Sequence, residues 1–461
     1  MSQQNTRASR TLVILVPLVG ALCAPESPIL AAPIDPGVRH GATDGGPPIP
    51  LPGLTADEQG YFQDGLTRFQ NVEAVSGGTN NGLGPRFNAD QCSSCHAQPF
   101  VGGSSPATNP QVAVATADGA TNTVPWFVVP NGPVREARFI QSNGAPDGGV
   151  HDLFVITGRT DAGSCAITQP NFLPAGNGLT GQGGNPNIIF RIPTPAMGAG
   201  LIESIPESAI RANMAANAFA KAAMGVKGHP NLSGNDGSIT RFGWKAQNKS
   251  LLMFSGEAYN VEMGISNQLF PQERDETPSC QGAFPTPNDV LNLSATTTTA
   301  VLSDIEAFAD FMRMLAPPAP APATASTQNG SVEFRKVGCA LCHTPSMTTG
   351  TAIASGSAST PSAALSNQPA NLFSDLLVHH MGSGLADGIT QGSAGPDEFR
   401  TAPLWGVGER LFFLHDGRTS NIVQAVEDHA GRGSEANEII QRFNSLSQQD
   451  QQDLIDFLRS L

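Results

Sequence analysis

The sequence predicts a mainly α-helical protein built from two similar modules, the first of which is enlarged by an insertion rich in strands and loops. Three observations predict this organisation. A Gly-x-x-x-Phe segment followed by Cys-x-x-Cys-His occurs twice, an amphipathic helical pattern closes each copy, and a Pro-rich segment separates the copies. The 461 residues are enough for two or three domains.

The repeat sets the expected module boundaries. Its first copy holds Gly65–Phe69 and Cys92-Ser-Ser-Cys95-His96, and its second holds Gly330–Phe334 and Cys339-Ala-Leu-Cys342-His343. Helical patterns over residues 303–315 and 446–461, the latter with Ser447 as a candidate N-cap, close the copies. We therefore expect an N-terminal module over residues 50–315, a Pro-rich linker over 316–328 and a C-terminal module over 329–461.

The insertion is expected at about residues 100–200. Runs of β-branched and aromatic residues at 124–129, 154–157 and 188–192 lie between Gly, Asn and Pro clusters, which is typical of short strands. A helical pattern resumes at 206–224, with Pro206 suited to the first turn.

The N-terminal 32 residues predict a secretory signal. Arg7 and Arg10 precede twelve mostly apolar residues, too few for a membrane span of about 20 residues. Cleavage is expected after Cys23 or near residues 31–32, and a lipid anchor on Cys23 remains an alternative, although residues 20–22 match a lipobox poorly. No later stretch approaches 18 apolar residues, so we expect a periplasmic or secreted protein without a membrane span.

The charge balance excludes some partners. The chain has 25 Lys and Arg against 39 Asp and Glu, a formal net charge of −14. This balance argues against a nucleic-acid or anionic-membrane binder.

The two Cys-x-x-Cys-His motifs are the attachment signature of c-type haem. Cys92 and Cys95 would bond one porphyrin and Cys339 and Cys342 the other, with His96 and His343 as the proximal iron ligands. The alternatives are a zinc ribbon and a redox-active cysteine pair, but neither requires the fixed histidine.

Two further cysteines, Cys165 and Cys280, remain after the haem cysteines and Cys23 are set aside. In an oxidising compartment they most simply form one disulfide, which would close a loop of about 115 residues and tie the insertion to its host module. A redox-active thiol pair is the open alternative.

His429 is the best candidate for a further iron ligand. In a helix over 422–429 it shares a face with Ile422 and Val426, and Gly431 would supply the C-cap. A core histidine bonded to a carbonyl is the alternative. His379 and His380 are weaker candidates, as is His415, beside which Arg418 could bind a haem propionate or simply belong to an Asp-Gly turn.

These residues together resemble the di-haem c-type oxidoreductases. This superfamily includes the bacterial di-haem cytochrome c peroxidases, the methylamine-utilisation di-haem enzyme, a branch named thiol oxidoreductases and, more distantly, rubber oxygenases. The resemblance covers about residues 55–461 and is carried by the segments 82–96, 242–247, 257–264, 399–406 and 413–418.

The resemblance implies two cytochrome c-type haem domains, one with the reactive haem and one with a six-coordinate haem that relays electrons. Glu262 matches the glutamate above the reactive iron, and Trp244 matches the tryptophan between the haems. His429 stands where the peroxidases carry a methionine, and a His/His haem has a lower potential than a His/Met haem.

The expected function is reduction of hydrogen peroxide at the N-terminal haem. Glu262 would act as the general acid–base group, Trp244 would relay electrons, and a small cytochrome c or cupredoxin would be the donor. A non-catalytic electron-transfer cytochrome and a haem-dependent oxygenase are the alternatives, and thiol oxidation has no residues here that require it. The resemblance also implies a calcium ion between the haem domains, for which the sequence indicates no ligands.

Overall fold

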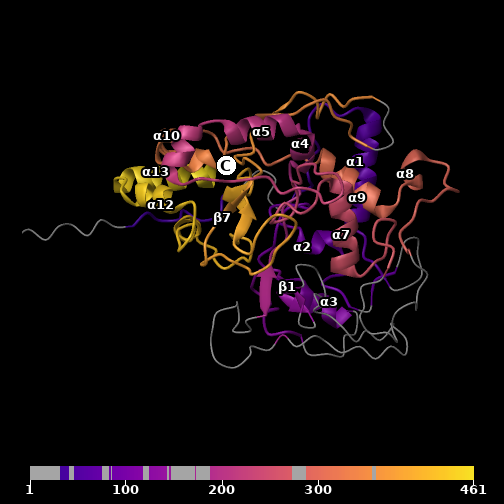
Figure 1. Cartoon of the computed structure of the whole chain (residues 1–461). Helices are drawn as coiled ribbons and strands as arrows, with labels where there is room; N and C mark the ends of the chain where they lie inside the picture. Colours follow the sequence, from indigo (N-terminus) through magenta and orange to yellow (C-terminus); the bar gives the residue numbers. More distant parts are fainter. Residues whose placement is uncertain are drawn as a thin grey trace, which may run out of the picture. The chain divides into compact units, whose positions relative to one another are not determined.

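Helices make up most of the regular structure (Figure 1). The computed structural model describes residues 32–40, 46–74, 82–84, 86–117, 124–142, 145–146, 172, 187–272, 287–355 and 360–461. The predicted signal up to residue 31, His151 and the cysteines Cys23, Cys165 and Cys280 lie outside the described residues, so the predicted disulfide stays a prediction. By their contacts, Pro33–Leu461 belong to one compact unit.

Within the described residues the helices are joined by loops, and every sheet has two strands. The helices are α1 (Ala56–Phe69), α2 (Cys92–Cys95), α3 (Gln111–Ala117), α4 (Ala199–Ser204), α5 (Glu207–Ala215), α6 (Ala218–Met224), α7 (Leu251–Met263), α8 (Thr298–Val301), α9 (Asp304–Met314), α10 (Ala325–Val337), α11 (Ile422–Glu427), α12 (Asn437–Asn444) and α13 (Gln448–Ser460), with 3₁₀ turns η2 (Cys339–Leu341) and η3 (Val407–Glu409). The strands form antiparallel pairs: β1 (Glu136–Phe139) with β4 (Ile188–Arg191), β2 (Gln141–Ser142) with β3 (Ala145–Pro146), β5 (Met347–Thr348) with β6 (Pro369–Ala370), and β7 (Val378–His380) with β8 (Glu398–Arg400).

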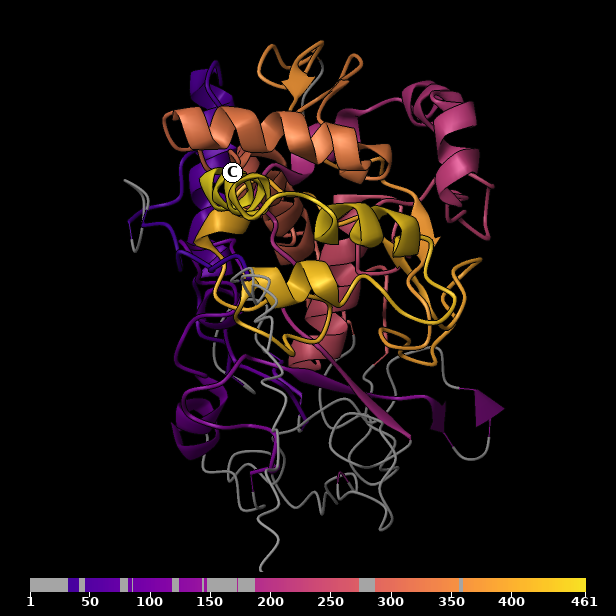
Figure 2. The same cartoon turned by 90° about the vertical axis from the view of Figure 1, so that its left-hand side faces the viewer.

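Two helix pairs organise the fold: α1 packs on α9, and α10 packs on α13. The members of each pair lie together in Figure 1, and Figure 2 again shows α10 (orange) beside the C-terminal helix α13 (yellow). The helical patterns at 303–315 and 446–461 thus predicted α9 and α13 correctly. Ser303 caps α9 through a capping box with Glu306, and Ser447 caps α13 through the backbone N–H of Asp450.

The glycine of the repeat lies where the helices cross. A Cβ at Gly65 would lie 2.2 Å from the carbonyl oxygen of Ala307 in α9, and one at Gly330 would lie 1.9 Å from that of Asp453 in α13. Only a residue without a side chain lets the two backbones approach this closely. The repeat therefore encodes the same close crossing twice.

The linker is shorter than predicted. Residues 316–324 have no regular structure, but α10 begins at Ala325, inside the segment 316–328 that was expected to be linker. Thr324 caps the helix through the backbone N–H of Thr327, and the following polar residues continue it. A run of polar residues after the prolines concealed this helix start.

The insertion is only partly as predicted. The strand at 188–192 is confirmed as β4, whereas Val124–Val129 form a turn, and α3 is a helix where only strands and loops were expected. The single helix predicted over 206–224 is wrong: it is divided into α5 and α6 at Asn217, whose φ of +56° lies in the left-handed region. Pro206 caps α5.

No helix among the described residues has both the length and the apolar character that a bilayer crossing requires.

Gly65→Ala should weaken the α1–α9 crossing. Because the new Cβ would meet backbone, the helices must separate, and we expect the free energy of unfolding to fall by about 1–3 kcal/mol. Urea denaturation of the haem-loaded protein measures this loss. Gly60→Ala in the same helix is the control, since nothing lies within 4 Å of its Cβ and alanine favours a helix. Equal midpoints for the two variants would contradict the proposed crossing.

Candidate active site

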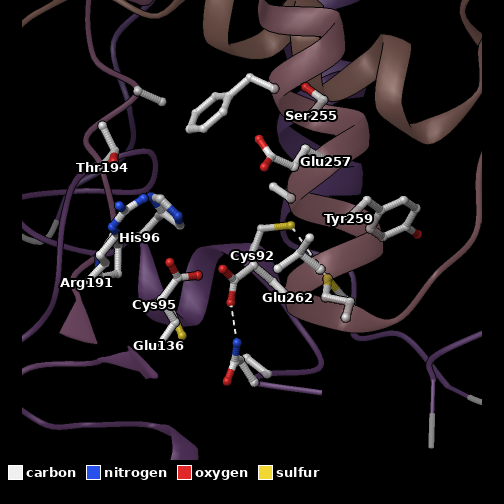
Figure 3. A pocket seen from close by; sticks show the side chains of 18 of the residues that line it. Cys92, Cys95, His96, Glu136, Arg191, Thr194, Ser255, Glu257, Tyr259 and Glu262 are labelled. Atoms are coloured by element: carbon white, nitrogen blue, oxygen red, sulfur yellow. Dashed lines mark hydrogen bonds between the residues drawn. The ribbon is translucent and has the colours of Figure 1, made fainter. Parts of the chain in front are cut away.

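The first Cys-x-x-Cys-His motif forms one helical turn. The backbone N–H of His96 donates to the carbonyl of Cys92 at 3.1 Å and closes the turn, so that both sulfurs and the imidazole line one cavity of about 1200 Å³ (Figure 3). The Nδ1–H of His96 donates to the carbonyl of Gly103 at 3.1 Å, which leaves Nε2 as the free ligand atom. Burial lowers the pKa of His96 to about 4, so the ring is neutral and able to bind a metal.

The second motif repeats this geometry. The N–H of His343 donates to the carbonyl of Cys339 at 2.9 Å, and the His343 Nδ1–H donates to the carbonyl of Phe373 at 3.0 Å. Burial lowers the pKa of His343 to about 4 as well. This motif lines a second cavity of about 1360 Å³.

The phenylalanine of the repeat supports each imidazole. The ring of Phe69 lies 6.0 Å from that of His96, and the ring of Phe334 lies 6.3 Å from that of His343, measured between centroids. The Gly-x-x-x-Phe segment thus places a glycine at the helix crossing and, one turn later, an aromatic ring against the ligand.

Both cavities fit haem c by their donors. All four motif cysteines have free sulfurs, as thioether bonds to haem vinyl groups require. In the second cavity the His429 ring lies 6.4 Å from that of His343. Imidazole–metal bonds are about 2 Å long, so two imidazoles on one metal place their ring centres about 6 Å apart. The Nδ1–H of His429 donates to the carbonyl of Ala425 at 2.7 Å, which leaves Nε2 free.

The local structure around His429 differs from the prediction. Helix α11 ends at Glu427 with Asp428 as its C-cap, so the expectation that Gly431 caps it is wrong. His429 therefore follows the helix instead of lying on it.

Two buried arginines suit the haem propionates. Arg400 and Arg410 line the second cavity, and no carboxylate of the described residues is bonded to them in the contacts of the structure. Burial lowers their pKa to about 10, which still leaves them charged at neutral pH, and Nε of Arg410 has no hydrogen-bond partner among the described residues. A buried cation needs an anion, and a propionate supplies one.

Arg418, the predicted propionate ligand, lies elsewhere. Its guanidinium is bonded to Asp416 at 2.7 and 2.8 Å and to the carbonyl of Gly384, and it lines neither cavity. Arg400 and Arg410 are therefore the residues of the second cavity that could hold the propionates of a haem, and Arg418 belongs to the Asp416–Gly417 turn.

Glu262 lies in the wall of the first cavity, near the C-terminal end of α7 (Figure 3). Its Oε2 accepts a hydrogen bond of 2.6 Å from the Asn88 side chain, and its carbonyl accepts one of 2.7 Å from the Asn88 N–H. Burial, followed by the nearby Glu136, raises the pKa of Glu262 well above its usual range. This shift favours the protonated, neutral form of the carboxyl group.

Glu136 and Arg138 come from β1 of the insertion and line the same cavity. Their side chains alternate with those of Ala137 and Phe139, as strand geometry requires, and they form an ion pair with each other. Sequence reasoning missed both residues, because a four-residue strand gives too weak a pattern and its partner strand lies about 50 residues away.

Trp244 lines both cavities and is 8% exposed. Its indole N–H donates to the carbonyl of Ile192 at 3.0 Å, which fixes the ring between the two motifs. His415 lies beside it, with its ring centroid 6.5 Å from that of Trp244 and 4.3 Å from that of Phe399.

The remaining histidine candidates are held by carboxylates. His379 is buried between Asp375 and Glu435 at 3.0 and 2.8 Å, and its Nδ1 lies 3.6 Å from Sγ of Cys342. Cys342, Asp375 and His379 form the one cluster among the described residues whose atoms could hold a metal ion. Its sulfur and imidazole are not the oxygen ligands that calcium prefers. His380 is half-exposed and bonded to Asp397.

Comparison with solved structures finds distant likenesses. A hydrazine synthase of Kuenenia stuttgartiensis is 22% identical (36% of this chain, 56% of that chain, TM-score 0.23). A MauG-like protein associated with microbial copper homeostasis is 20% identical, with 36% of this chain and 55% of that chain covered and a TM-score of 0.24. The diheme peroxidase BthA of Burkholderia thailandensis is 15% identical, with 48% of this chain and 65% of that chain covered and a TM-score of 0.29. The match therefore spans less than two thirds of the length of each of these chains. Among curated proteins no sequence matches significantly.

The family comparison is more specific. Residues 185–461, more than half of the chain, match the family model described as "Di-haem oxidoreductase, putative peroxidase". This match includes the second Cys-x-x-Cys-His motif, Trp244, Glu262 and His429. The chain therefore belongs to the di-haem oxidoreductase family.

Proposed function

We propose that the protein is an exported di-haem peroxidase that reduces hydrogen peroxide in the first cavity and receives electrons through the second. One observation carries this proposal: the two cavities differ in their ligands. The second presents two facing imidazoles, His343 and His429, whereas His96 is the one imidazole among the described residues that line the first. To bind peroxide, the first haem would need an open position, and we propose that it lies on the side of Glu262.

The haem iron, when bound, would supply the peroxide-binding position and the electrons for cleavage of the O–O bond. The protein supplies the proton chemistry. Burial raises the pKa of Glu262 and so favours a carboxyl group that can give a proton, and Asn88 fixes that group by its 2.6 Å hydrogen bond to Oε2. A positioned acid–base group of this kind contributes about 10²–10⁴-fold to the rate of a proton transfer.

Trp244 suits the passage of electrons between the haems because it lines both cavities. The donor would be a small cytochrome c or cupredoxin. The net charge of −14 favours a donor with a basic docking face. Export is proposed on the N-terminal signal pattern alone.

The decisive assay is steady-state turnover with hydrogen peroxide and a reduced small cytochrome c or cupredoxin. Consumption of two electrons per peroxide would support the proposal. Absence of turnover together with two low-spin ferric haems would instead identify an electron carrier. A stable oxygen adduct that cleaves an unsaturated substrate would identify an oxygenase.

Glu262→Gln should lower peroxide turnover by about 10²–10⁴-fold, because the amide can neither take up nor release the proton. The absorption spectra of both haems should stay unchanged, since Glu262 is not a proposed ligand. Glu257→Gln is the matched comparison: it lies on the same helix and lines the same cavity, but its carboxylate is bonded to Asn248. A loss below tenfold is expected there, and equal losses would remove the special role of Glu262.

His429→Ala should convert the second haem from low-spin to high-spin in the ferric state, because the iron would lose one of its two imidazoles. His429→Met should keep it low-spin and raise its midpoint potential, since a methionine ligand raises the potential. Electron paramagnetic resonance and a redox titration measure the two effects. The half-exposed His380, replaced by alanine, is the control and should leave both readings unchanged.

A further inference from the structure

We propose that Glu136 and Glu262 act as one acid–base unit, a carboxyl–carboxylate pair that shares a single proton and is anchored in the cavity wall by Arg138. The proposal deepens the proposed peroxidase function and rests on it for the role of the shared proton. The existence of the pair, however, is a property of the protein that can be measured without turnover.

The geometry brings together two distant parts of the chain. Glu136 lies on β1 in the insertion and Glu262 near the end of α7, and both side chains line the first cavity, where each shifts the pKa of the other. Figure 3 shows their carboxyl groups facing each other within the cavity. Ionised carboxylates can only accept hydrogen bonds, so a bond between two carboxyl groups requires a proton on one of them.

The surrounding charges decide which group carries the proton. Glu136 forms an ion pair with Arg138 and stands opposite Arg191 in the β1–β4 register. These cations lower the pKa of Glu136 to about 2 despite its burial. Glu262 has its nearest polar support in the neutral Asn88 amide, and burial beside an ionised neighbour raises its pKa well above the usual range. The proton therefore resides on Glu262, whose O–H donates to Glu136.

Charged and titratable groups face Glu262 from several elements of the cavity wall. They are Arg138 and Glu136 on β1, Arg191 on β4, Glu257 on the same helix, the neutral His96, and the sulfurs of Cys92 and Cys95, which carry no charge as thioethers. The guanidinium of Arg191 is bonded to Asp387 at 2.7 Å and to Gln391 at 2.8 Å. Arg138 is therefore the cation that sets the charge of the pair.

Such a pair can give one proton and accept another. Reduction of hydrogen peroxide breaks one O–O bond and consumes two electrons and two protons to form two waters. The electrons come from two molecules of the one-electron donor protein, and the protons come from solvent. Glu262 gives its proton to the departing oxygen, and the proton that replaces it enters a pair that still holds one negative charge, stabilised by Arg138. A lone buried glutamate would lack this second carboxylate.

Infrared difference spectroscopy tests the pair directly. The spectrum of the ferric haem-loaded protein minus that of Glu262→Gln should contain a protonated-carboxyl band at neutral pH that shifts in D₂O. Glu136→Gln should weaken or lose this band at neutral pH, because the substitution removes the neighbouring negative charge that helps to raise the pKa of Glu262. Glu136→Asp should restore it at least in part, whereas Glu257→Gln should keep it.

The pH dependence of turnover gives a second reading. Turnover that needs protonated Glu262 falls as the pH rises through its raised pKa. In Glu136→Gln the pH at which turnover falls should be lower by about one unit or more. Above that pH, turnover of the variant should be about tenfold lower than that of the wild-type protein. The proposed pair would be wrong if Glu136→Gln left both the protonated-carboxyl band and the pH profile of turnover unchanged.

The outcomes separate the two proposals. If no variant reduces peroxide but the band depends on Glu136, the pair stands and the peroxidase function fails. Haem content shows whether Glu136→Gln folds. If it does not fold, the test uses the infrared spectrum of the wild-type protein. Absence of the protonated-carboxyl band at neutral pH would contradict the proposed pair, and its presence would support it.

Discussion

The close crossing of two helices at a glycine is the constraint on which each haem cavity depends. At Gly65 and at Gly330 the backbone of one helix lies against the carbonyl of its partner. This contact fixes the direction of the residues one turn later, so Phe69 and Phe334 support His96 and His343 at nearly the same distance. The backbone carbonyls of Gly103 and Phe373 then fix the imidazole orientation. In each cavity the imidazole is therefore held with its free nitrogen available to a metal.

Charge is distributed differently in the two cavities. The first holds two glutamates beside Arg138, and we have proposed that these glutamates share a proton. The second has Arg400 and Arg410 without a bonded carboxylate, so it is prepared for an anionic ligand. Because an isolated buried charge is costly, each arrangement points to the group that completes it. Both cavities carry a haem-binding motif, but the two glutamates line the first and the two arginines without a bonded carboxylate line the second.

The sequence predicted those parts of the site that follow from local rules. The haem-binding turns and the helices α9 and α13 follow from spacing and helical periodicity. The same periodicity drew attention to His429, but its ring faces His343 from beyond the end of α11. Glu262 and Trp244 came from the resemblance to a family. Glu136, Arg138, Arg400 and Arg410 could not be predicted, because their roles depend on contacts between distant segments and on burial. The break at Asn217 was also missed, since a left-handed residue in an alanine-rich run leaves the helical pattern intact.

The two haem-binding turns are connected to their helices in different ways. In the second motif a single residue, Gly338 with φ +112°, separates α10 from η2, so the turn is joined almost directly to the α10–α13 pair. In the first, residues 70–91 separate α1 from α2, and the turn is instead linked to α7 through Asn88 and Glu262. We expect the second haem to have the smaller reorganisation energy on changing its redox state, as suits an electron relay.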